Sequence, residues 1–385
     1  GMVVPKLLYD NDFPMPHMFG RANLNFPGLG FLLHRAGAIF IRRSFQDNEL
    51  YKITLRHYVG YLMEKRFPMN WAFEGTRSRL GKLMPPRYGL LKYVLEACHA
   101  TDARNIPISI SYDLIRDVEE YATEQTSQGK GAESLRWLIG YIRSLARPMG
   151  KIYVDIGEPV VLERAPDPDD KLALSKIAFE VAVEANHVTA ITFPSLVTMS
   201  LLGAAPKALT HNEVLADLRA LLRWAQERNL RISKDFDPAY ADQLPDLIGI
   251  MLDEGIVTRY DEGQEAVYGI GMDQHAVASY YRNTVIHFFV NKAIIELAML
   301  KASENEGPNA LEVFWAEVDQ LRDLFKFEFF YAPTEEFHRQ IREELDRYDK
   351  DWPTVLSRGT VGFTQLFNRM IPLVSHVTLL IYAEA

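Results

Sequence analysis

Residues 71–81, WAFEGTRSRLG, combine the side chains that a binding site for a phosphorylated molecule needs. The segment places one carboxylate, Glu74, beside Gly75 and close to two arginines, Arg77 and Arg79. A guanidinium group can pair with phosphate oxygens through two parallel hydrogen bonds. Because an apolar run precedes these residues, we expect a buried strand to deliver them to one place.

Two further segments strengthen this interpretation. GAIFIRR at residues 37–43 reads as a strand that ends in two arginines, Arg42 and Arg43. NIPISISY at residues 105–112 is an apolar strand in which Pro107 fits a strand start or a sheet edge. Each segment alone is a weak signal, since an Arg-Arg strand end is more often simply exposed. The three together, in this order, favour a substrate site.

The histidines and the single cysteine favour packing or surface roles. His17, His34 and His57 have no Cys, His or acidic residue at ligand spacing, which argues against a metal site. Cys98 is the only cysteine, so it forms no internal disulfide, and we expect a small buried apolar residue in a protein of a reducing compartment.

The elements that position these residues follow an α/β pattern in the first half. Short β-branched or aromatic runs alternate with helical periodicity, which is typical of α/β folds. The predicted strands cover residues 17–21, 38–42, 69–73, 106–112 and 151–154, with a short run at 160–162. A helix is predicted over residues 48–65, which carry an apolar stripe.

The second half is predicted to be mainly helical. Residues 164–170, RAPDPDD, cannot continue a strand and predict a surface linker. We therefore expect one domain over residues 1–165 and another over residues 166–385. The predicted helices of the second domain cover residues 171–185, 195–202, 212–228, 243–253, 275–301 and 310–325.

Residues 256–270 predict a two-stranded hairpin directly after a helix, the local plan of a winged helix. Nucleic-acid binding is the least favoured function, because the hairpin carries Asp261, Glu262 and Glu265.

The amino-acid composition indicates a globular protein. With 48% hydrophobic, 24% charged and 11% aromatic residues, the 385-residue chain can bury a sizeable core and is not a disordered tail. No apolar run approaches the roughly 20 residues of a membrane-spanning helix, and the start does not resemble a signal peptide.

Positive charge is concentrated near the motifs. Residues 1–100 hold 14 of the 42 Lys and Arg but only 7 of the 51 Asp and Glu, so this part carries a net charge of +7 and the remainder −16. A basic lobe on an acidic protein predicts a local anionic partner such as phosphate, a coenzyme or a lipid headgroup.

Together the three segments resemble the glycerol-3-phosphate acyltransferase family, in its large bacterial form, which is related to the dihydroxyacetone-phosphate acyltransferases. The resemblance covers residues 1 to about 165, and SYYRN at residues 279–283 resembles the family's C-terminal region. The matching positions are Gly37, Phe40, Ile41, Arg42 and Arg43 in the family's second block, Glu74, Gly75, Arg77, Ser78 and Arg79 in its third, and Ile106, Pro107 and Ile108 in its fourth.

The resemblance implies a fold and a reaction. The fold is an acyltransferase-like mixed sheet flanked by helices, followed by a mainly helical domain with a winged-helix-like hairpin. The reaction transfers a fatty acyl group from acyl-CoA or acyl carrier protein to the sn-1 hydroxyl of glycerol 3-phosphate, the first step of phospholipid biosynthesis.

The resemblance also implies partners and site residues. We expect no metal, no further cofactor and no nucleic-acid partner. We do expect peripheral contact with the anionic cytoplasmic side of the cell membrane. The implied substrate-binding residues are Arg42, Arg43, Glu74, Gly75, Thr76, Arg77, Ser78 and Arg79.

The family's first block, a His-x4-Asp pair that serves as general base and its orienting group, has no match here. None of the ten histidines is followed by Asp five positions later; only His338 has an acid there, Glu343. The family's spacing predicts that the sequence begins just after this block, so we expect the chain to lack the catalytic base and to be inactive alone.

Two alternatives remain open. The chain could be a non-catalytic protein of the same fold that binds phosphate or a lipid precursor. It could also belong to an enzyme that acylates dihydroxyacetone phosphate or a lysophospholipid.

Overall fold

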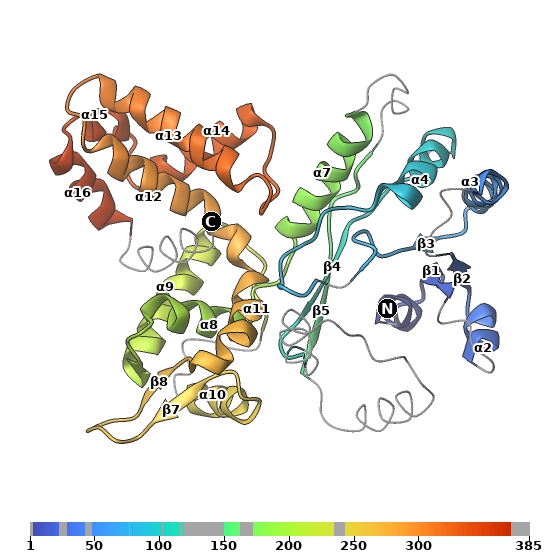
Figure 1. The fold of residues 1–385 in the computed structure, drawn as a ribbon, viewed down its shortest axis with the longest axis horizontal. Coiled ribbons are helices and arrows are strands. Elements are labelled where there is room, and N and C mark those ends of the chain that lie inside the picture. Colours follow the sequence, from blue (N-terminus) through green and yellow to red (C-terminus); the bar gives the residue numbers. More distant parts are fainter. Residues whose placement is uncertain are drawn as a thin grey trace. The chain divides into compact units, whose positions relative to one another are not determined.

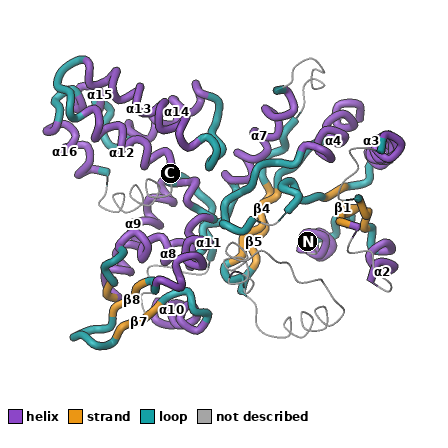
Figure 2. The backbone as a smooth tube through the Cα atoms, in the orientation of Figure 1, coloured by secondary structure: helices purple, strands orange, loops and turns teal. Residues whose placement is uncertain are grey.

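The computed structural model describes residues 3–22, 29–42, 48–76, 78–101, 103–115, 118, 150–161, 172–234 and 243–370. In this part the chain is a mixture of α and β with small sheets and mostly helical residues, which confirms the predicted fold class (Figures 1 and 2). The chain divides into two compact units. The first comprises residues 1–77, 83–108 and 156–184, and the second comprises residues 78–82, 109–155 and 185–385. The predicted linker at 164–170 lies outside the described residues.

The first unit contains a three-stranded parallel sheet with the order β2-β1-β3. Its strands are β1 (His17–Arg21), β2 (Ala38–Ile41) and β3 (Met69–Asn70). Met18 of the central strand pairs with Ala38 on one side and with Asn70 on the other. The strands predicted at 17–21 and 38–42 are confirmed, whereas β3 ends three residues before the predicted end at Phe73.

Two helices of the first unit pack against each other and form a small core. The helices of this unit are α1 (Val3–Asp10), α2 (Leu29–Arg35), α3 (Glu49–Glu64), α4 (Tyr88–Thr101) and most of α7 (Ala173–His187). Asn48 caps α3 by accepting a hydrogen bond from a backbone N–H of its first turn. Leu55 and Val59 of α3 meet Val94 and Cys98 of α4, so the cysteine is buried as predicted.

Strands β4 (Ile108–Tyr112) and β5 (Ile152–Ile156) form a pair of their own, and the division between the units falls within both strands. The strand prediction for residues 160–162 corresponds to an isolated bridge between Val160 and Asn105.

The second unit is a helical assembly around one large core. Helix α8 is buried from Phe193 to Leu202, as expected of an apolar helix surrounded by other helices. The other described helices of the second unit are α9 (His211–Glu227), α10 (Leu244–Asp253), α11 (His275–Asn283), α12 (Val290–Ala302), α13 (Asn309–Phe325), α14 (Thr334–Asp346), α15 (Trp352–Leu356) and α16 (Thr360–Arg369), with short 3₁₀ turns η3 (Met272–Gln274) and η4 (Ile286–Phe288).

The predicted hairpin follows α10 as β7 (Thr258–Tyr260) and β8 (Val267–Gly269), and β6 (Leu209–Thr210) completes an antiparallel sheet with the order β6-β8-β7 (Figure 1). This confirms the winged-helix-like local plan.

The single helix predicted over residues 275–301 is wrong, because the structure breaks it between Asn283 and Val290. The Thr284 hydroxyl donates to the Tyr281 carbonyl at 2.7 Å. The N–H groups of Thr284 and Val285 bond three residues back rather than four. Such side-chain competition and tightened turns end an α-helix locally.

Candidate functional site

Two of the predicted segments directly follow strands of the first unit's sheet. The carboxyl ends of parallel strands lie at the same edge of a sheet, where open α/β folds hold their ligands. Arg42 follows the end of β2, and residues 71–76 follow the end of β3. β2 stays paired with β1 as far as Arg21, whereas β3 ends level with Met18, so Arg42 lies at the carboxyl edge and the Glu74–Thr76 turn leaves the sheet earlier.

Tyr51 of α3 holds Arg42 at this edge. Its hydroxyl accepts a hydrogen bond from the Arg42 backbone N–H at 3.1 Å, and the guanidinium carbon lies 5.1 Å from the centre of its ring. Cation–π contact orients the guanidinium while its N–H groups stay able to bind an anion. Arg42 itself is exposed. No sequence pattern pointed to Tyr51.

A tight turn ends β3 and explains why the strand stops short of the prediction. The N–H of Gly75 donates to the Ala72 carbonyl at 3.0 Å, and the N–H of Arg87 donates to the Phe73 carbonyl at 3.0 Å. Gly75 has a φ of +64°, and a Cβ added there would lie 2.7 Å from Cγ of Arg87. Glycine alone meets both requirements without strain.

Glu74 is half-buried beside this turn. Its Oε2 accepts a hydrogen bond from the Met84 backbone N–H at 2.8 Å. Burial raises the pKa of Glu74, and the Met84 hydrogen bond offsets part of that rise. A carboxylate held in this way is suited to bind a hydroxyl or to orient an arginine.

Replacing Glu74 with glutamine should change the pH dependence of stability. Because the folded-state pKa of Glu74 is raised, the stability linked to this group is fully present at low pH and is lost as the pH rises through the folded pKa. Glutamine cannot ionise, so the unfolding free energy of Glu74→Gln relative to wild type should increase with pH. Denaturant titrations between pH 4 and pH 8, with Glu64→Gln at the exposed end of α3 as control, measure this. A difference that shrinks with rising pH would contradict it.

The end of the 71–81 segment belongs to the second unit. Arg79 is exposed there, and the Ser78 hydroxyl is a buried polar atom with no hydrogen-bond partner among the described residues. Lys82 pairs with Glu328 at 3.1 Å.

The predicted site residues therefore fall into three groups. Four lie in the first unit, namely Arg42, Glu74, Gly75 and Thr76, and two lie in the second, Ser78 and Arg79. Arg43 and Arg77 lie outside the described residues. The sequence did not point to Tyr51, Met84 or Arg87, because their contacts depend on tertiary packing.

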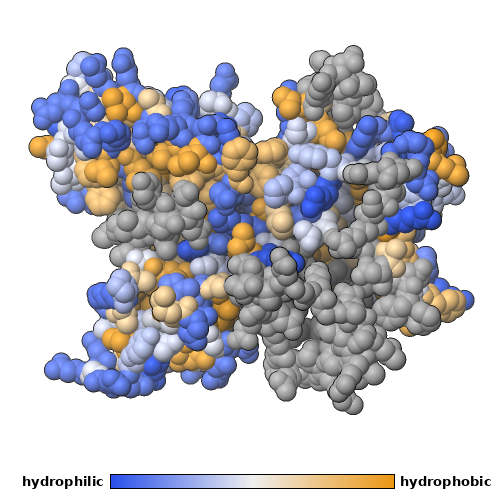
Figure 3. Space-filling model, in the orientation of Figure 1, coloured by the Kyte–Doolittle hydropathy of each residue, from blue (hydrophilic) through white to orange (hydrophobic). Residues whose placement is uncertain are grey.

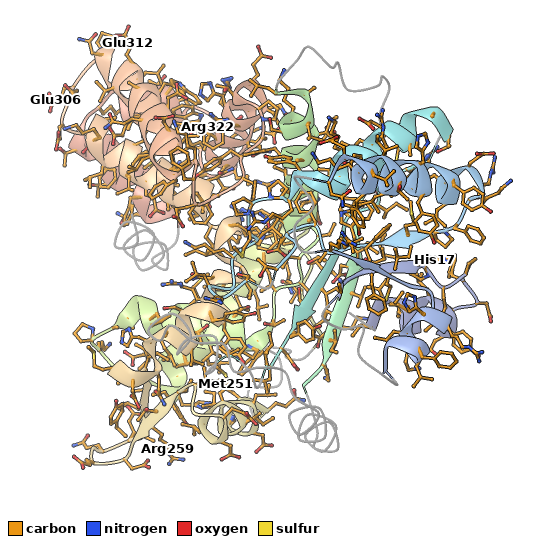
Figure 4. The ribbon with its side chains drawn as sticks, turned by 45° about the vertical axis from the view of Figure 1, so that its right-hand side comes forward. His17, Met251, Arg259, Glu306, Glu312 and Arg322 are labelled. Atoms are coloured by element: carbon orange, nitrogen blue, oxygen red, sulfur yellow. The ribbon has the colours of Figure 1, made fainter. Side chains whose placement is uncertain are left out.

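The amino-terminal histidines pack rather than face the carboxyl edge. His17 begins β1, at the opposite end of the central strand from the Arg42 edge, and its ring lies 5.0 Å from that of Phe67 (Figure 4). His34 packs edge-on against Phe40 at 4.7 Å. Among the described residues, no three His, Cys, Asp or Glu side chains gather in a way that could hold a metal ion. Nor is any helix in the same part of the chain long and apolar enough to cross a membrane.

Both halves of the chain match models of known protein families. Residues 2–111 match the family model described as "Acyltransferase", and residues 121–368 match "Glycerol-3-phosphate acyltransferase C-terminal region".

Curated relatives agree with these matches. The protein plsB1 of Mycobacterium tuberculosis, named as an acyltransferase, is 36% identical over 356 residues, which cover 90% of this chain and 57% of plsB1. Glycerol-3-phosphate acyltransferase of Pasteurella multocida is 27% identical over 369 residues, which cover 90% of this chain and 45% of that protein. The chain thus spans about half the length of the relatives it matches. Since the C-terminal-region model alone matches well over half of the 385 residues, the chain belongs to the glycerol-3-phosphate acyltransferase family.

Proposed function

We propose that this chain is part of a glycerol-3-phosphate 1-O-acyltransferase and supplies its acceptor site. The enzyme would transfer a fatty acyl group from acyl-CoA or acyl carrier protein to the sn-1 hydroxyl of glycerol 3-phosphate, as the first step of phospholipid biosynthesis. One observation carries the proposal. In a chain of this family, the turn that follows β3 holds a half-buried Glu74 beside Gly75, whose positive φ and close approach to Arg87 favour glycine.

The proposed roles follow from the chemistry of each side chain. Arg42 or Arg43, together with Arg77 and Arg79, would neutralise and orient the acceptor phosphate, since guanidinium groups bind phosphate bidentately. Glu74 would hold the polyol or one of these arginines. Thr76 and Ser78 would offer hydroxyls, and Gly75 would let the backbone approach the substrate.

The reaction itself is an acyl transfer. The acceptor hydroxyl loses its proton to a general base and attacks the thioester carbonyl, the tetrahedral intermediate collapses, and the thiolate leaves and is protonated. The family's His-x4-Asp pair would supply that base, and no such pair occurs in the 385 residues.

A direct test separates binding from catalysis. We expect the 385-residue chain to bind glycerol 3-phosphate in calorimetry but to show negligible acyl transfer. A longer chain that carries a His-x4-Asp segment at its amino end should transfer acyl groups. Robust acylation by the 385-residue chain would show that another group serves as the base.

One observation favours a second candidate function. Because the 385 residues lack the His-x4-Asp pair, a non-catalytic protein that binds phosphate or a lipid precursor would fit the same site. Reading the codons upstream of Met2 for this pair distinguishes the two. Acceptor assays with dihydroxyacetone phosphate and lysophospholipids then test the remaining choice of acceptor.

The proposal includes peripheral contact with the cytoplasmic side of the cell membrane, because the acyl donor and the product are amphiphilic. Apolar side chains reach the surface of the first unit around α2 and α3 (Figure 3). On α3, Leu50 is 76% exposed and Ile53 is 52% exposed, on a helix that also carries Lys52 and Arg56. Exposed apolar side chains beside basic residues support adsorption to anionic lipid.

Vesicle binding tests this contact. We expect the protein to adsorb to vesicles that contain anionic lipid, with adsorption that weakens as salt is added. Ile53→Glu should weaken adsorption by about tenfold, because it replaces an apolar contact with the lipid by a negative charge that anionic lipid repels. Leu300→Glu is the matched control, since Leu300 is 51% exposed on a helix of the second unit. Equal binding to neutral and anionic vesicles would count against the basic surface as the contact.

A further inference from the structure

Helix α11 of the second unit contacts the end of one of the family's motifs and a residue that follows another. Residues 78–82 end the WAFEGTRSRLG motif, and Ile115 lies just after β4, the strand of the NIPISISY motif. Both belong to the same compact unit as α11. The contacts come from its last turn, SYYRN, which the resemblance did not connect with the acceptor site.

Asn283 holds the main chain next to Arg79. Its Nδ2 donates a hydrogen bond to the Leu80 carbonyl at 2.9 Å. Its Oδ1 accepts two hydrogen bonds from the Arg282 guanidinium, from Nε at 3.0 Å and from Nη2 at 2.8 Å. Because the guanidinium can only donate, these bonds fix which end of the amide faces Leu80.

Both residues of this arrangement are buried. Arg282 is 2% exposed and Asn283 is 5% exposed. Burial lowers the pKa of Arg282 to about 10, so the guanidinium remains charged at neutral pH. An amide buried between a guanidinium and a carbonyl has no water to replace a lost partner, so breaking either bond is costly.

The backbone of Gly81 lies directly against the same turn of α11. Gly81 has a φ of +83°, and a Cβ added there would lie 2.1 Å from the Tyr280 carbonyl oxygen. The main chain at residues 80 and 81 is therefore held both by a hydrogen bond and by close packing. The Lys82 ion pair with Glu328 adds a third attachment.

Tyr281 holds the second segment from the same turn. Its hydroxyl accepts a hydrogen bond from the Ile115 N–H at 2.9 Å and donates one to the Ile115 carbonyl at 3.2 Å. Asn283 and Tyr281 thus tie Leu80, at the end of one motif, and Ile115, just after the other, to one helix turn.

We propose that Asn283 is a positioning residue of the acceptor site, which sets the affinity for glycerol 3-phosphate by fixing the main chain beside Arg79 without touching the substrate. The inference rests on the proposed function, because it takes Arg79 as a ligand of the acceptor phosphate. It gives the C-terminal helical region a role in substrate binding.

Asn283→Asp is the sharpest test. Aspartate keeps the shape and still accepts from Arg282, but it cannot donate to the Leu80 carbonyl. We expect the affinity for glycerol 3-phosphate, measured by calorimetry on the 385-residue chain, to fall about tenfold. The salt dependence of binding should stay as in wild type, because Arg79 keeps its charge. Hydrogen exchange of the ligand-free protein should be faster in a peptide that covers residues 78–84.

Asn291→Asp is the matched control. Asn291 donates from Nδ2 to Gln340 at 3.2 Å in the same unit, so this change also removes one asparagine donor from a side-chain hydrogen bond. It should leave the affinity and the exchange of residues 78–84 unchanged. If Asn283→Asp lowers the melting temperature, Asn283→Ser removes the same contact without a buried charge and should show the same two effects.

The outcomes separate this inference from the proposed function. A wild-type protein that binds, together with Asn283→Asp and Asn283→Ser variants that bind equally well, would overturn the positioning role and leave the proposed function standing. A wild-type chain with no affinity for glycerol 3-phosphate would contradict the proposed function. In that case the positioning role for this substrate would be wrong as well. Faster hydrogen exchange of residues 78–84 in the Asn283 variants would still support the anchoring of this segment.

Discussion

Alanine in place of Gly81 should destabilise the second unit by at least about 2 kcal/mol, because two independent constraints act at this position. The backbone has a φ of +83°, which an L side chain rarely adopts, and the added Cβ would lie 2.1 Å from the Tyr280 carbonyl oxygen. A backbone atom cannot move aside as the end of a side chain can. Denaturant unfolding followed by circular dichroism and tryptophan fluorescence measures the loss.

Gly249→Ala is the matched control in the same unit. Gly249 lies inside α10, and a Cβ added there would meet nothing within 4 Å. Alanine is favoured over glycine in a helix interior, so this variant should be more stable than wild type by roughly 0.5–1 kcal/mol. A Gly81→Ala variant as stable as wild type would mean that residues 80 and 81 are not held as the structure places them.

Loss of the motif arginines should have the largest effect on substrate binding. A hydrogen bond to a charged group contributes about 1.5–3 kcal/mol, so Arg77→Ala and Arg79→Ala should each weaken glycerol 3-phosphate binding by roughly 10- to 100-fold. Removing one guanidinium should also reduce the salt dependence of binding, unlike the Asn283 variants. Calorimetry at two salt concentrations measures both quantities.

Arg104→Ala provides the control for net charge, since Arg104 is an exposed arginine of the first unit outside the motifs. It should bind glycerol 3-phosphate as wild type does. Equal affinity of wild type and Arg77→Ala would remove that residue from the phosphate site. If Arg79→Ala also bound normally, the whole assignment of this motif to phosphate would be wrong.

Local patterns predicted much of the fold. The strand at 17–21 and the hairpin after α10 are confirmed, because alternating apolar residues and turn residues carry their own local signal. The break after Asn283 was not predicted, because apolar periodicity continues through it while hydroxyl-to-backbone bonds decide the local structure. The early end of β3 depends on the turn at Gly75, whose positive φ cannot be read from an apolar run.

Residue type alone predicted the chemistry of the candidate site but not its supports. Glu74 and Gly75 stand out in the sequence, and the structure gives both a defined environment. The contact of Asn283 with Leu80 joins residues 203 positions apart, and no local pattern encodes such a pairing. Arg87 likewise reaches Gly75 only through tertiary folding.

The assignment of residues 78–82 to the second unit bears on how this protein can be dissected. A cut between residues 111 and 121, where the two family matches meet, would separate Leu80 and Gly81 from Tyr280 and Asn283. The amino-terminal fragment would expose the turn at Gly81, because the Tyr280 backbone that packs against it would be missing. The carboxyl-terminal fragment would bury the Asn283 amide without the Leu80 carbonyl that accepts its hydrogen bond. Fragments made at the apparent sequence boundary should therefore express poorly, and mixing them should restore solubility only when they associate.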